Sequence, residues 1–297
     1  MSTTYWQKRM EIPGRVSFSE GNGDMPRIEI KTPHSNGEIY LNGATVTHFQ
    51  RNGEPPILFL SQFSRWAAGQ PIRGGVPICF PWFGAREGAP QHGFARTTSW
   101  DLREIIQTPN GGVSVRLGLP ESADASLYPP FTADYVVTFD KQLTLELLIK
   151  NTSADQDFSF ENCLHTYFTV GDINAVSLTG LKGASFLDKV DNFSRKVETS
   201  QNLKINQETD RIYVDTGSTV EIHDSKLQRR IVVEKEGAQS TVVWNPWEAK
   251  AQQMPDFGNE EYPHMVCVES GNVSDNRLVL PAGKTALLKV VIDSLPL

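Results

Sequence analysis

Two stretches of the sequence each carry a side chain that can move protons near neutral pH. His165 lies in the strand-like run 158–168, and Glu269 follows the apolar run 264–268, just before Ser-Gly-Asn. A carboxylate at the end of a core strand is held rigidly and can still reach a pocket, which suits a general base. A single histidine in a strand is more often structural, and a strand-end carboxylate often accepts from a loop amide. The residue types therefore leave catalysis and a structural role open.

A third stretch, 72–84 together with 91–96, combines a tight backbone with polar side chains. Its glycines and prolines are too dense for a helix, and its apolar residues are too continuous for a solvent loop. The polar side chains are those of Arg73, Gln91, His92 and Arg96. Burying so many polar groups is costly unless they face a ligand. The two arginines could bind a phosphate bidentately, or could instead form salt bridges with nearby carboxylates.

Read as one strand, 158–168 alternates between two faces. Period two places Phe158, Phe160, Leu164 and Phe168 on one face, and Glu161, Cys163, His165 and Tyr167 on the other. Glu161 is then a candidate for the carboxylate that keeps His165 protonated, and Tyr167 could orient the ring. Asp215 ends another strand-like run, 210–215, and taken alone it is a turn cap.

The rest of the chain indicates an all-β scaffold. Short alternating or β-branched runs recur between turn signals, which favours a large antiparallel β-sandwich. No repeat and no low-complexity linker interrupts the sequence, so we expect a single domain over 1–297. Helices are expected only as one or two turns at 7–10, 60–66 and 121–126. The expected strands are 27–31, 37–49, 113–119, 133–139, 143–150, 158–170, 175–179, 211–214, 219–223, 228–234, 240–244, 264–268 and 285–292.

Composition and charge exclude several classes of function. The net charge of −7 argues against a nucleic-acid or anionic-membrane surface. No apolar run is long enough for a signal core or a membrane span, so we expect a cytoplasmic protein. The three cysteines are widely spaced in apolar runs and should be free buried thiols. No dinucleotide, phosphate-loop or zinc-protease motif occurs, so neither a cofactor nor a metal is expected.

The joint order and spacing of several motifs resembles the glucose-6-phosphate 1-epimerases, hexose-6-phosphate mutarotases of the aldose 1-epimerase superfamily, and most closely their bacterial branch. The resemblance runs from about residue 37 to the C-terminus, and the region 63–70 departs most from the family pattern. The motifs that carry it are Ile-Arg-Gly-Gly-Val-Pro at 72–77, Phe-Pro-Trp-Phe-Gly at 80–84, Gln-His-Gly-Phe-Ala-Arg at 91–96, Leu-His-Thr-Tyr-Phe at 164–168, Asp-Ile at 172–173, Val-Trp-Asn-Pro at 243–246 and Cys-Val-Glu at 267–269.

The resemblance implies a galactose-mutarotase β-sandwich with the active site in the concave face of a sheet. It implies that His165 is the general acid and Glu269 the general base. Four positions match substrate-binding residues, and His92 is added because a histidine in a similar place contacts the sugar in the free-sugar epimerases; the set is Arg73, Gln91, His92, Arg96 and Asp215. The substrate would be a hexose 6-phosphate whose α and β anomers interconvert by ring opening and closure. Glutamate is ordinarily ionised at neutral pH, whereas histidine needs a favourable neighbour to stay protonated.

Three other functions remain open at this point. An epimerase of free hexoses would turn over glucose and its 6-phosphate equally. A glycoside hydrolase would need two carboxylates flanking one bond, for which Asp215 and Glu269 are the pair to nominate. A carbohydrate-binding protein could use the aromatic residues Trp82, Phe83, Tyr167 and Trp244. The preferred hexose 6-phosphate stays undetermined, and we expect a monomer because no long amphipathic helix offers a dimer face.

Overall fold

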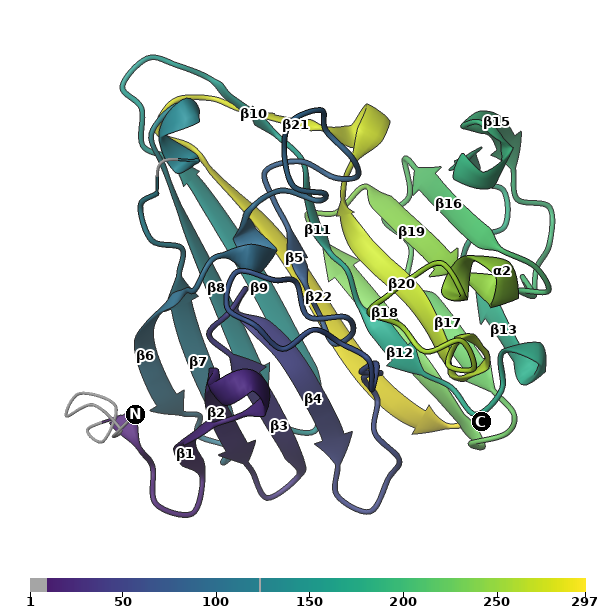
Figure 1. Ribbon diagram of the computed structural model, residues 1–297, viewed down its shortest axis with the longest axis horizontal. Helices are drawn as coiled ribbons and strands as arrows, with labels where there is room; N and C mark the ends of the chain where they lie inside the picture. Colours follow the sequence, from purple (N-terminus) through teal and green to yellow (C-terminus); the bar gives the residue numbers. More distant parts are fainter. Residues whose placement is uncertain (1–9, 123) are drawn as a thin grey trace.

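The computed structural model describes residues 10–122 and 124–297 of the chain. It is built almost entirely of antiparallel strands, as the sequence predicts (Figure 1). The helix expected at 7–10 lies almost wholly outside the described residues. No helix within the described ranges is long and apolar enough to cross a membrane.

Two eight-stranded sheets and two smaller ones make up the described fold. The first large sheet has the order β15 (Ser194–Val197), β14 (Ser185–Asp188), β16 (Thr209–Val214), β19 (Ser240–Asn245), β20 (Met265–Asn272), β11 (Asn162–Leu164) and β5 (Ile78–Cys79), and β12 (Tyr167–Thr169) also pairs with β20. The second has the order β13 (Val176–Thr179), β17 (Val220–Asp224), β18 (Arg229–Glu236), β22 (Thr285–Pro296), β9 (Leu143–Asn151), β8 (Phe131–Phe139), β7 (Val113–Gly118) and β6 (Asp101–Gln107).

The remaining strands form two smaller sheets, and the helical elements are short. The four-stranded sheet is β1 (Val16–Glu20), β2 (Pro26–Lys31), β3 (Ser35–Tyr40) and β4 (Thr45–Arg51), and β10 (Phe158–Phe160) pairs with β21 (Leu278–Leu280). The helical elements are α2 (Trp247–Ala251) and the 3₁₀ turns η1 (Asn22–Asp24), η2 (Ala95–Thr97), η3 (Ala125–Leu127), η4 (Ile173–Ala175), η5 (Lys189–Asp191), η6 (Tyr262–His264) and η7 (Ser274–Asn276). The turns expected at 60–66 are not helical, and α2 was not expected.

The main hydrophobic core runs between the two large sheets. Alternate residues of β8 and β9 point into it, as the period-two pattern of their sequences requires. From the facing sheet, β20 contributes Val266 and Val268. The intervening side chains, Cys267 and Glu269, therefore point to the opposite face of that sheet, away from this core. Every residue of β20 is nevertheless buried, because loops cover this second face as well.

The run 158–168, which the sequence predicts as one strand, is divided between three. β10 pairs outside the large sheet, whereas β11 and β12 both pair with β20. The amide of His165 donates to Pro77 O (3.0 Å), which continues the pairing of β11 with β5. The chain then bends before β12, where the amide of Thr166 donates back to Leu164 O (3.0 Å). The predicted apolar face, which includes Phe160 and Leu164, does lie in the core.

Candidate active site

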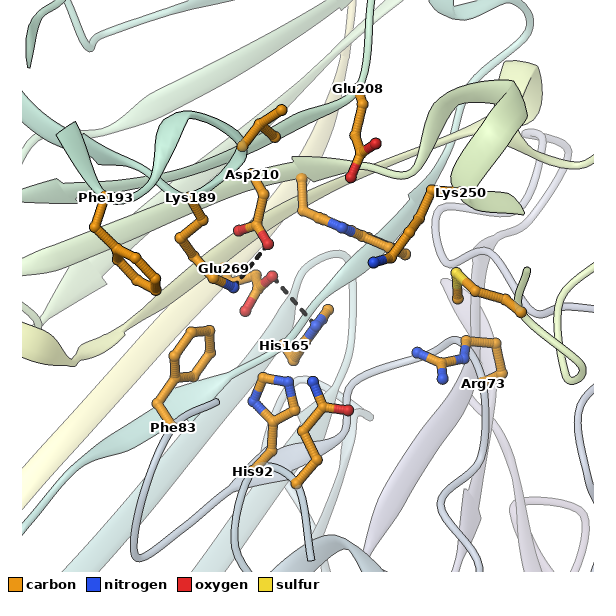
Figure 2. A pocket seen from close by; sticks show the side chains of 14 residues that line it. Arg73, Phe83, His92, His165, Lys189, Phe193, Glu208, Asp210, Lys250 and Glu269 are labelled. Carbon is orange, nitrogen blue, oxygen red and sulfur yellow. Dashed lines mark ion pairs between the residues drawn. The ribbon is translucent and has the colours of Figure 1, made fainter. Parts of the chain in front are cut away.

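A cavity of about 420 Å³ opens on the face of the large sheet that points away from the main core. Strands β16, β19 and β20 supply its base, and loops from both halves of the chain supply its walls (Figure 2). The lining residues are Arg73, Phe83, Gln91, His92, His165, Lys189, Val190, Phe193, Glu208, Asp210, Trp244, Lys250, Met254 and Glu269. Five of the seven residues nominated from the sequence are among them; Arg96 and Asp215 are not.

His165 and Glu269 meet in this cavity. In the ladder between β11 and β20, Cys163 lies opposite Gly271 and Leu164 opposite Ser270, so the next residue, His165, falls across from Glu269. Its Nε2 is 3.3 Å from Glu269 Oε1, the contact drawn as a dashed line in Figure 2. Both side chains are almost fully buried. The proposed acid and base are therefore held within proton-transfer distance of each other.

Aromatic neighbours fix the orientation of the imidazole. Tyr167 stacks on His165 with ring centroids 4.7 Å apart and planes at 11°. His92 and Trp244 approach the same ring edge-on, at 5.6 and 6.1 Å. The predicted orienting role of Tyr167 thus has a geometric basis.

The surroundings of the pair oppose a separate charge on either member. Burial, followed by the positive charges of Arg96 and Arg73, lowers the pKa of His165 well below its ordinary value. Burial, followed by the negative charge of Asp210, raises the pKa of Glu269 well above its ordinary value. The expectation of an independently ionised Glu269 and a protonated His165 does not fit these directions. The 3.3 Å contact between the two side chains would allow them to share one proton.

Glu161 is not the carboxylate beside His165, which corrects the single-strand interpretation. Its oxygens accept from the amides of Phe83 (3.0 Å) and Ser274 (2.7 Å), and Arg277 lies 3.6 Å away. The break in the strand after β10 turns Glu161 toward these loops. The carboxylate that contacts the imidazole is that of Glu269 itself.

Arg73 forms the side of the pocket opposite Lys189 in Figure 2. Its Nε and Nη2 donate to Asp256 Oδ2 at 3.2 and 3.0 Å, and its Nη1 donates to the hydroxyl of Tyr167 at 3.1 Å. Burial opposes its charge, but Tyr167 and Asp256 outweigh burial and raise the pKa of Arg73. The salt bridge considered from the sequence is thus present, and it fixes a guanidinium that still lines the cavity.

Gln91 and His92 reach the cavity from a loop stabilised by its own backbone. The amide of His92 donates to Gly84 O (2.8 Å), and the amide of Gly84 donates to His92 Nδ1 (3.1 Å). Burial, then the charge of Arg96, lowers the pKa of His92 well below its ordinary value, so the ring is neutral. Because Nδ1 accepts a hydrogen bond, the single ring proton lies on Nε2. His92 can therefore donate a hydrogen bond to a hydroxyl of a bound ligand.

Arg96 lies beneath this loop. It is buried on η2, and its Nη2 donates to Gln91 O at 2.7 Å. Its Nε has no hydrogen-bond partner among the described residues. Burial lowers the pKa of Arg96. Its charge acts on His92 and His165, but it does not line the cavity in this structure.

The acidic residue that β16 contributes to the cavity is Asp210, at its beginning, and not Asp215, which follows its end. Asp215 is bonded to Asn276 in both directions, through its amide (3.1 Å) and its carboxylate (2.8 Å). Asp210 lies opposite Trp244, which lies opposite Cys267, so these three share the cavity face of neighbouring strands. Five residues along a strand span roughly 16 Å, which separates the two carboxylates. The hydrolase alternative loses its nominated pair.

The chain is similar to known proteins over most of its length. A family model described as aldose 1-epimerase matches residues 26–293. The chain belongs to the aldose 1-epimerase family. A relative from Cenchrus ciliaris, provisionally named glucose-6-phosphate 1-epimerase, is 34% identical over 87% of this chain and 81% of its own length. One from Escherichia coli K12 with the same provisional name is 33% identical over 86% of both chains.

Two solved structures have the same fold. A crystal structure from Salmonella typhimurium, provisionally named a mutarotase, superposes with a TM-score of 0.88 at 31% identity, covering 97% of this chain and 96% of that one. A galactose mutarotase-related enzyme from Lactobacillus acidophilus gives a TM-score of 0.67 at 15% identity, over 90% of this chain and 96% of that one. The predicted galactose-mutarotase β-sandwich is therefore confirmed.

Sequence reasoning missed two lysines in the pocket of this aldose 1-epimerase family member. Lys189 of η5 bonds Asp210 at 2.7 Å and lies over the ring of Phe83. Lys250 of α2 lies at the rim and forms no ion pair with any described residue. Elements η5 and α2 provide this rim, and the region 63–70, which departs most from the family pattern, does not line the cavity. Neither lysine lies in a recognisable motif, and only the alternation of β16 could have indicated Asp210.

The same site brings together potential metal ligands. His165, Cys267 and Glu269 each offer one ligand atom, and these atoms lie within 4.8 Å of one another. The sequence places His165 about a hundred residues before the other two, so no ligand spacing was visible. The three cysteines are free and buried, as predicted.

Proposed function

We propose that this protein interconverts the α and β anomers of a hexose 6-phosphate, with glucose 6-phosphate as the reference substrate. The observation that carries the proposal is the buried contact between His165 and Glu269 inside a sugar-sized cavity. Membership of the aldose 1-epimerase family supports the reaction class. The provisional names of the curated relatives support the phosphorylated substrate.

Anomer exchange needs two proton transfers and no other chemistry. One group takes the proton of the C1 hydroxyl while the other gives a proton to ring oxygen O5, and the C1–O5 bond breaks to give the aldehyde. Rotation about the C1–C2 bond presents the other face of the aldehyde. Attack of the O5 hydroxyl on C1 then reverses both transfers. A pair that holds one proton begins and ends this cycle in the same state, so it needs no reset.

We assign the base at O1 to Glu269 and the acid at O5 to His165. In the empty pocket their contact lets the shared proton lie on either residue. A sugar entering between them replaces that contact with two hydrogen bonds, one to each reacting oxygen. Positioned groups of this kind each contribute about 10²- to 10⁴-fold to a rate.

The remaining polar side chains suit the rest of the sugar. Asp210 can accept hydroxyl hydrogens, and His92 can donate from Nε2. Gln91 can do both. Arg73 and Lys250 lie on the same side of the pocket in Figure 2 and supply positive charge for a phosphate. This local charge explains how a chain of net charge −7 could bind an anion.

The test is a measurement of anomer exchange. NMR exchange spectroscopy on glucose 6-phosphate should show exchange well above the spontaneous rate when the protein is added. The same measurement on free glucose separates the main proposal from the free-hexose alternative: equal acceleration of both sugars would favour the latter. Sugar binding without any acceleration would support a carbohydrate-binding protein.

We also propose that residues 1–297 form one domain. The main core contains residues from β1 through β22, which supports this assignment. A single cooperative unfolding transition, observed by calorimetry, is the expected result. The expectations of a monomer and of a cytoplasmic location stay predictions.

A further inference from the structure

Three potential metal ligands meet at the base of the pocket. Cys267 and Glu269 are two residues apart on β20, so their side chains leave the same face of the sheet. His165 reaches them from the bend between β11 and β12. All three are buried, and their ligand atoms lie within 4.8 Å of one another. The epimerase chemistry proposed above uses the histidine and the glutamate but gives the thiol no role.

The donor set matches one class of cation. Imidazole nitrogen, thiolate sulfur and carboxylate oxygen are the ligands that zinc and cadmium accept, whereas magnesium and calcium require oxygen donors. His165 Nε2 and Glu269 Oε1 are 3.3 Å apart. Two ligand atoms at about 2 Å from a tetrahedral ion are separated by roughly 3.3 Å. The His165 and Glu269 atoms therefore already have the spacing that such an ion requires. Cys267 Sγ lies within 4.8 Å of both atoms, and His165 and Glu269 line the cavity from which an ion would enter.

Charge balance also permits such an ion. A divalent cation with one carboxylate, one thiolate and one neutral imidazole is neutral overall. Coordination requires the ligands in their deprotonated forms, so binding releases their protons to solvent. The positive charges of Arg73, Arg96 and Lys189, which would oppose a bare cation, do not oppose this complex.

One feature makes the ion a reversible inhibitor and not a resident cofactor. The Nδ1 atom of His165 has no hydrogen-bond partner among the described residues, whereas the histidine ligands of resident zinc usually donate to a second group.

We propose that His165, Cys267 and Glu269 form an inhibitory site for a thiophilic divalent cation of the Zn²⁺ or Cd²⁺ type, which excludes the sugar. The inhibition rests on the proposed function, but the binding does not. Cation binding and epimerase activity can therefore be tested separately.

The binding test uses cadmium and the full chain. Addition of Cd²⁺ to chelator-treated protein should produce the ultraviolet absorption band of a cadmium–thiolate bond. Cys267→Ser should abolish the band, and Cys267→Ala should do the same if serine affects folding. Cys79→Ser is the matched control, because this thiol is equally buried and lies outside the cluster. A band that survives both Cys267 variants, or one that is lost in Cys163→Ser instead, would overturn the assignment.

The activity test uses zinc. Zn²⁺ should inhibit anomer exchange competitively with glucose 6-phosphate, and a chelator should restore the rate. Cys267→Ser should retain turnover and resist Zn²⁺. Equal inhibition of wild-type and Cys267→Ser would contradict the proposal. If the protein has no epimerase activity, the cadmium band still decides whether the site exists.

Discussion

The ring of Tyr167 lies parallel to the imidazole of His165, and its hydroxyl accepts a hydrogen bond from Arg73. One side chain thus connects the proposed acid with the proposed anion anchor. The two functions of Tyr167 can be separated by substitution, because one belongs to the ring and the other to the hydroxyl.

Tyr167→Phe should keep the stack and lose the hydrogen bond. We expect the KM for glucose 6-phosphate to rise about fivefold, corresponding to about 1 kcal/mol, with little change in kcat. Tyr167→Leu also removes the stack, so kcat should fall as well. Steady-state kinetics of the two variants test this. A fall in kcat as large in Tyr167→Phe as in Tyr167→Leu would show that the hydroxyl, and not the ring, supports His165.

Removal of either proton carrier should reduce catalysis without unfolding the protein. His165→Gln and Glu269→Gln should each lower the exchange rate by about 10²- to 10⁴-fold. The double variant should lose little more than either single variant, because the pair acts as a unit. NMR exchange measures the rates, and thermal melting checks the fold. Nearly full activity in either single variant would exclude that residue as a proton carrier.

The pH profile should reflect a pair that works with one proton. The rate should fall at acidic pH, when a second proton binds to His165. Because the pKa of His165 is lowered, this fall should occur at a pH below the ordinary histidine pKa of about 6.5. The alkaline fall in rate requires loss of the one proton that the pair holds. Because the pKa of Glu269 is raised, this fall should occur at a pH well above the ordinary glutamate pKa of about 4.3. A profile of kcat/KM, corrected for spontaneous exchange, tests this. An acidic limb at or above 6.5 would contradict the coupled pair.

Lys250 offers a test of phosphate recognition, because it lines the rim without an ion-pair partner among the described residues. Lys250→Met should raise the KM for glucose 6-phosphate several-fold and leave any turnover of free glucose unchanged. The effect should diminish at high ionic strength. Lys284→Met, on an exposed turn outside the pocket lining, is the matched control. Equal effects on both sugars would assign Lys250 to the hexose and not to the phosphate.

Asp210 on β16 and Asp215 in the turn after it can be compared directly by substitution. Asp210→Asn should lower kcat/KM about 10- to 100-fold, because it removes a charged acceptor from the cavity and frees Lys189. Asp215→Asn should leave the kinetics unchanged, because this side chain is bonded to Asn276 outside the cavity. The reverse ranking would restore the assignment made from the sequence alone.

Much of the fold could be predicted because alternation is a local property. Along β8 and β9, buried residues alternate with more exposed ones. The motifs around Arg73, His165 and Glu269 indicated the pocket before any coordinates. Short edge strands such as β15, with no buried residue, carry no such signal and were missed.

The errors at the site arise from long-range pairing. The two-residue alternation of a strand assigned Glu161 to the same face as His165. The strand ends after β10, however, because β10 pairs with β21 and not with the large sheet. The choice between Asp210 and Asp215 depends on which end of β16 lies over the cavity. That end is set by pairing with β19, far along the chain. The contact of Cys267 with His165 likewise exists only after β20 pairs with β11 and β12.

The cavity joins loops from the first third of the chain to strands from the last third. Arg73 and Glu269 line one cavity only when the whole sandwich has closed around its core. Catalytic activity therefore requires the complete fold. Loss of turnover on denaturation should coincide with global unfolding, and a truncated chain that lacks β20 should be inert however well its remaining strands fold.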